Sequence, residues 1–104
     1  MATFVNLGFN PIGANAQSTA GSSVGAGTSV TLTAPTDASK LLMQAFVQSC
    51  KFTLDESAPG TFSTGNGFEL TAGDPPMLIP IKAGQDIKIV QEAAGAVVNY
   101  QFGN

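Results

Sequence analysis

Short strands punctuated by Gly and Pro are the pattern from residue 28 onward. Residues 29–34 alternate polar and apolar side chains and end at Pro35, which is typical of a half-buried strand. Turn signals separate four further expected strands: residues 68–71, 77–81, 86–91 and 96–102. The short segment 92–95 predicts a hairpin that joins the last two.

The apolar segment 41–54 predicts one long bent strand or two short ones. Over residues 41–47 apolar side chains fall on both faces, as in a strand that is covered on both sides. A helix over 38–50 is the competing interpretation, because Leu42, Ala45 and Phe46 lie at helical spacing and Asp37 could cap it. We favour strand, since the later residues are β-branched and aromatic.

Residues 55–67 are rich in Ser, Gly and Thr and predict a surface loop. Six to eight short strands with such turns are typical of a sandwich or barrel. The expected fold is therefore mainly β: a small antiparallel β-sandwich or barrel with an extended N-terminal arm.

The N-terminal region differs from the rest in composition. Residues 13–29 are small and polar apart from Val24, which predicts an irregular or flexible spacer. We therefore divide the chain into an arm and spacer (1–27) and a β-domain (28–104).

An apolar cluster precedes this spacer: Phe4, Val5, Leu7, Phe9 and Ile12. Residues 3–9 are either a strand of the domain's own sheet or an anchor that docks on a neighbouring subunit. The five residues are our candidates for partner binding.

The residue inventory argues against an enzyme. The chain has no His, Arg or Trp, one Cys and four Lys. Asp55 and Glu56 are adjacent, so in extended chain they point apart, and Ser57 with Lys51 is a weak nucleophile pair. We expect no catalytic residues, no cofactor and no metal site.

Cys50 lies in an apolar segment and has no partner for an intrachain disulfide, so we expect a buried thiol. The net charge of −3, without clustered Lys, disfavours nucleic acid as a partner. The apolar stretches are far shorter than the roughly 20 residues that cross a membrane. Without a signal-like N-terminus, the expected place of synthesis and first residence is a cytoplasm.

The C-terminal half contains the sequences LD, GFEL, AGDPP, LIPI and IKI at residues 54–55, 67–70, 72–76, 78–81 and 87–89. In these segments it resembles small virion-associated proteins of tailed bacteriophages. The resemblance implies a capsid decoration (cement) protein, assembled in the host cytoplasm and bound as a homotrimer to the major capsid protein on the outer surface of the head. It carries no site motif.

Two other functions stay open. A tail, head-fibre or connector component would have the same composition. A carbohydrate-binding β-module would need exposed aromatic side chains. Phe62 and Phe68, which flank a Gly-containing loop, either form such a surface or, as we favour, both pack back onto the core.

Overall fold

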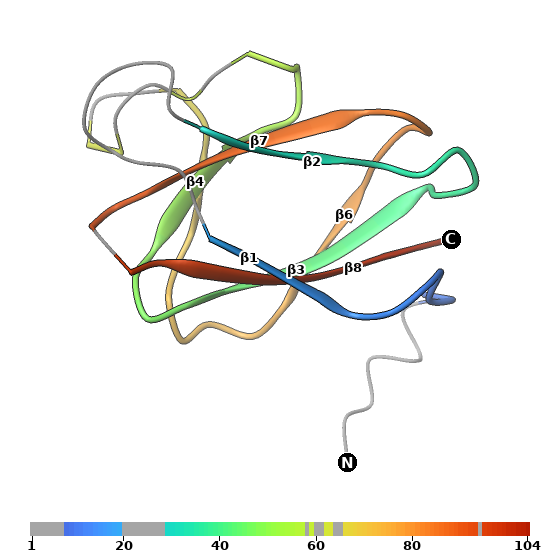
Figure 1. Cartoon of the computed structure of the whole chain (residues 1–104), viewed down its shortest axis with the longest axis horizontal. Coiled ribbons are helices and arrows are strands. Elements are labelled where there is room, and N and C mark those ends of the chain that lie inside the picture. The colour runs from blue at the N-terminus through green and yellow to red at the C-terminus, as the bar shows by residue number, and fades with distance from the viewer. Residues whose placement is uncertain (1–7, 20–28, 58, 60–61, 64–65, 94) are drawn as a thin grey trace.

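The computed structural model describes residues 8–19, 29–57, 59, 62–63, 66–93 and 95–104. Its described part is all β, with two four-stranded antiparallel sheets packed face to face (Figure 1). The strands are β1 (Ala16–Thr19), β2 (Val30–Thr33), β3 (Lys40–Phe46), β4 (Cys50–Thr53), β5 (Phe68–Leu70), β6 (Met77–Pro80), β7 (Asp86–Gln91) and β8 (Val97–Gly103). The expected antiparallel sandwich is confirmed.

The strand order is that of a jelly roll. Sheet A has the order β1-β8-β3-β6 and sheet B the order β2-β7-β4-β5. The first four strands therefore pair with the last four in nested fashion: β1 with β8, β2 with β7, β3 with β6 and β4 with β5. Two stacked sheets of this kind, built from eight strands, are a fold of viral capsid and lectin domains.

Alternation along the strands places the core between the sheets. In β3, Leu41, Met43 and Ala45 point inward and are buried. Ile87 and Ile89 of β7 face them from sheet B. Each strand thus gives one face to the core, as period-two patterning requires.

Segment 41–54 forms two strands, β3 and β4, and no helix. Cys50 at the start of β4 is fully buried, as expected, and burial raises the pKa of its thiol to about 11. The neutral thiol is therefore its stable form at ordinary pH.

The hairpin expected between the last two strands is wrong. The chain instead crosses from β7 in sheet B to β8 in sheet A. Turn length alone does not distinguish a hairpin from such an arch, because the difference lies in which partners the two strands find. Here β7 pairs with β2 and β4, whereas β8 pairs with β1 and β3.

Part of the expected spacer is also ordered against the expectation, since Ala16–Thr19 form the edge strand β1. Its backbone pairs with residues 97–100 of β8. An edge strand is held by main-chain hydrogen bonds, so small polar side chains suffice there. The strand that composition alone missed belongs to the sandwich.

The connections between strands alternate between the two ends of the sandwich. At one end the β3–β4, β5–β6 and β7–β8 connections meet: Ser49 accepts hydrogen bonds from the Glu92 and Ala72 amides, on its carbonyl and Oγ respectively. At the other end the β2–β3, β4–β5 and β6–β7 connections meet, through hydrogen bonds from Gln85 to Leu54 and between Gly84 and Ala34. We call these the turn end and the loop end.

Candidate functional site

Two of the five predicted anchor residues lie within the described chain, and both contact its own fold. Phe9 is buried, and its ring lies against Gly103 of β8. Ile12 is half-buried on the core, and its amide donates to the Phe102 carbonyl. Phe4, Val5 and Leu7 lie outside the described residues.

The outward face of sheet A is poor in charge. On β3, the side chains between the buried ones are Leu42, Gln44 and Phe46. Their neighbours across the sheet are Leu78 on β6 and Gln101, Asn99 and Val97 on β8. Among these neighbouring positions only Lys40, at the start of β3, carries a charge. Apolar residues do lie on both faces of β3, as the sequence predicts, but the described chain covers only the inward face.

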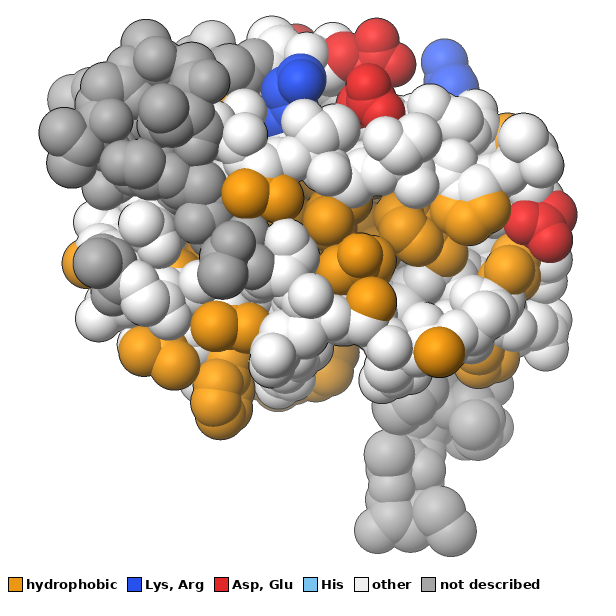
Figure 2. Space-filling model, in the orientation of Figure 1, with side chains coloured by type: hydrophobic (Ala, Val, Ile, Leu, Met, Phe, Trp, Pro, Cys, Tyr) orange, Lys and Arg blue, Asp and Glu red, His pale blue; other side chains and the backbone are white. Residues whose placement is uncertain are grey.

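The outward face of sheet B is the opposite in character. Lys88 lies across from Thr31 and Asp86 across from Thr33, and both pairs are joined by side-chain hydrogen bonds. Figure 2 shows the same asymmetry: the visible charged side chains gather mainly on the upper side, over β2 and β7. The lower side, toward sheet A, shows hydrophobic and uncharged side chains.

A strained apolar turn borders the sheet A face at the turn end. Phe46 and Val47 are 56% and 63% exposed. Val47 has φ 74°, and the Gln48 amide donates to the Phe46 carbonyl at 2.9 Å, which closes a γ-turn around Val47. A β-branched residue is a genuine outlier in this region of backbone space. Sequence reasoning missed this pair; the only signal was an apolar run that continued past the expected core positions.

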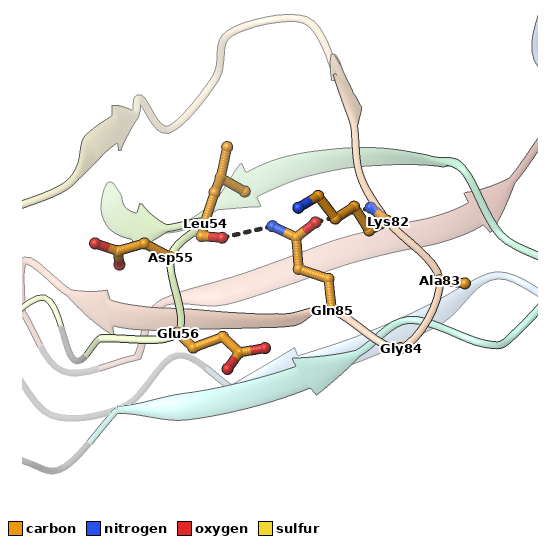
Figure 3. Close-up of a pocket in the computed structure, with 7 residues that line it drawn as sticks. All are labelled: Leu54, Asp55, Glu56, Lys82, Ala83, Gly84 and Gln85. Carbon is orange, nitrogen blue, oxygen red and sulfur yellow. Dashed lines mark hydrogen bonds between the residues drawn. The ribbon is translucent and has the colours of Figure 1, made fainter.

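The loop end carries a polar hollow of about 280 Å³ between the β4–β5 loop and the β6–β7 turn (Figure 3). Gln85 bridges its walls, because its Nε2 donates to the Leu54 carbonyl and its Oε1 accepts from the Lys82 amide. Asp55 and Glu56 extend in different directions in Figure 3, so these carboxylates do not form a pair.

A second hollow of about 360 Å³ shares Leu54 and Asp55 with the first. It is lined by Thr53, Leu54, Asp55, Ser57, Asn66, Gly67 and Phe68. Phe68 is 65% exposed, whereas Phe62 is half-buried with the Lys51 Nζ 5.5 Å from its ring centroid. Phe68 therefore keeps most of its surface in solvent, while its ring contacts that of the buried Phe52.

Among the described residues, no three His, Cys, Asp or Glu side chains are grouped as a metal ion would require. The described residues contain no helix long and apolar enough to span a membrane. No protein family model, curated protein or solved structure matches the chain.

Proposed function

We propose that this chain is a structural protein of a bacteriophage particle, a capsid decoration protein that binds the major capsid protein as a homotrimer. The observation that carries the proposal is the unequal character of the two sheet faces. The outward face of sheet B carries charged side chains, which suit contact with water. The outward face of sheet A is nearly uncharged and is bordered by the exposed Phe46 and Val47.

The apolar face has the composition of a contact surface. Leu42, Leu78 and Val97 are only half-buried, and Phe46 lies next to Val97 in the pairing of β3 with β8. Interface cores are depleted in charge and enriched in aromatic residues. We assign this face, with the turn at Val47, to the contact with the capsid and with neighbouring copies.

The strain at Val47 supports the same assignment. A non-Gly residue in this conformation costs on the order of 1–3 kcal/mol, and such residues cluster at functional sites. An exposed turn gains no core packing in return. A role in binding explains why a large apolar side chain is held there.

A decoration protein can also attach through a small contact area on each copy. A trimer on a repeating shell engages several equivalent sites at once, so modest single contacts add up to stable attachment. The jelly-roll topology agrees with a capsid role, although a fold by itself does not determine a function.

Co-sedimentation with capsids assembled without this chain tests the proposal. We expect the wild-type chain to pellet with them and the double variant Phe46→Ser, Val47→Ser to lose about tenfold or more in affinity, as for an interface anchor. The matched control is Phe68→Ser, which removes an equally exposed ring at the other end and should bind normally. Equal binding by the double variant and the wild type would contradict the assignment.

A further inference from the structure

We propose that the hollow beside Phe68 is a binding site for uncharged saccharides. This site lies at the loop end, whereas the Phe46–Val47 turn precedes β4 at the turn end. A chain bound to a particle through its apolar face and turn end would thus present the hollow to the medium. The inference goes beyond decoration and stands on its own residues.

The backbone of the loop presents the Phe68 ring as a platform. Gly67 has φ 126°, and a Cβ on it would lie 2.8 Å from the Phe52 carbonyl oxygen, so only Gly fits this close approach. Phe68 follows directly and pairs with Phe52, whose ring centroid is 6.0 Å away at an interplanar angle of 44°. The ring is therefore supported from one side while most of its surface stays exposed.

Another part of the lining, residues 53–57, is a hydrogen-bonded polar turn. The amide and Oγ of Ser57 both donate to Asp55 Oδ1, at 3.1 and 2.5 Å, and Thr53 Oγ1 donates to the Ser57 carbonyl. The bond from the Ser57 hydroxyl, and after it the bond from the Ser57 amide, hold the pKa of Asp55 below its usual range, so its carboxylate is charged at neutral pH. Both bonds from Ser57 end on Oδ1, so with respect to the described residues Oδ2 keeps acceptor capacity for a ligand.

This combination matches the chemistry of a sugar. A pyranose ring has a C–H face that packs against an aromatic ring, and its hydroxyls donate charge-assisted hydrogen bonds to a carboxylate. Asn66 adds an amide on the rim. The volume of about 360 Å³ is at the lower end of ligand sites.

The charge of the hollow selects among saccharides. Among the described residues that line it, Asp55 is the one ionisable group, and the chain contains no Arg or His. An anionic sugar would meet a carboxylate without a compensating cation in the lining, so like-charge repulsion excludes sialic and uronic acids. The expected ligands are neutral hexoses and N-acetylhexosamines.

An amide NMR titration of the isolated 15N-labelled chain tests this without any particle, so its result is independent of the decoration proposal. The probes are maltose, lactose, cellobiose, N,N′-diacetylchitobiose and, as the acidic sugar, 3′-sialyllactose. We expect saturable shifts at residues 53–57 and 66–68 with at least one neutral probe, with a dissociation constant on the order of 1 mM.

Matched variants make the test specific. Phe68→Ala should weaken binding about tenfold, and Asp55→Ala should weaken it by a similar factor, because each removes one of the two recognition elements. Phe46→Ala, at the turn end, should leave the shifts unchanged, and the same spectra report whether each variant is folded. The proposal is overturned if no neutral probe gives saturable shifts, if Phe68→Ala binds like the wild type, or if 3′-sialyllactose binds as well as the neutral sugars.

Discussion

Val47 shows how a single residue can be held against its own preference. Its left-handed backbone, φ 74°, suits Gly, yet the position carries an exposed β-branched side chain. Natural proteins keep such costs where function needs the side chain, since stability above a threshold is not further selected. A substitution that relieves the strain at Val47 should therefore leave the chain able to fold.

We expect Val47→Gly to stabilise the chain by about 1 kcal/mol, because relief of a strain of roughly 1–3 kcal/mol exceeds the backbone entropy cost of Gly, about 0.5–1 kcal/mol. Urea unfolding measures this as a higher midpoint with an unchanged slope. Gln48→Gly, one residue on and without the positive φ, is the control and should destabilise. A midpoint for Val47→Gly at or below that of the wild type would show that the turn is not strained.

At the scale of elements, the N-terminal segment is held to β8 before β1 begins. Asn10 and Asn104 exchange two backbone hydrogen bonds of 2.8 and 3.0 Å, and Gln101 Nε2 donates to the Ile12 and Gly13 carbonyls. Phe9 fills the space above Gly103, where an added Cβ would lie 2.4 Å from its ring. Residues 9–13 therefore contribute to the stability of the sandwich.

Gly103→Ala should cost about 1–3 kcal/mol, as expected when a methyl group is forced into a filled space. In a Phe9→Ala background the same substitution should cost less, because the contact with the ring is gone and only the 2.6 Å approach to the Asn10 carbonyl oxygen remains. A double-mutant cycle from denaturant unfolding gives the coupling. Equal costs in the two backgrounds would mean that Phe9 does not occupy this position.

Strand positions were predictable where side chains alternate between core and solvent. The expected strand 86–91 coincides with β7, and the strand within 29–34 contains β2. β1 was missed because Ala, Gln, Ser and Thr carry no apolar period, and the last hairpin was wrong because turn residues do not encode a strand's partner. Pairing across the fold depends on contacts distant in sequence, which local patterns do not contain.

The candidate site was less predictable than the fold. Phe68 was recognised as one of two possible exposed rings, but which ring is exposed depends on the backbone at Gly67. Phe9 is apolar enough for an anchor or a core position, and its burial against Gly103 follows from tertiary packing. The strain at Val47 has no sequence signal, because any residue type can be forced into an unusual conformation by its surroundings.

At the scale of the whole molecule, the jelly roll separates two surfaces. The outward face of sheet A, with the Phe46–Val47 turn beside it, is apolar and nearly uncharged, whereas the outward face of sheet B carries charges and the loop end carries the two hollows. We propose that this arrangement orients the chain between a capsid shell and water, with copies of the chain present throughout the shell.

The copy number of the chain in purified particles tests this claim most directly, by quantitative mass spectrometry against the major capsid protein. We predict a ratio close to one copy per capsid subunit, because a decoration protein occupies every equivalent position of the lattice. A few copies per particle would contradict decoration and indicate a tail or connector component, and absence from the particles would contradict a virion role altogether.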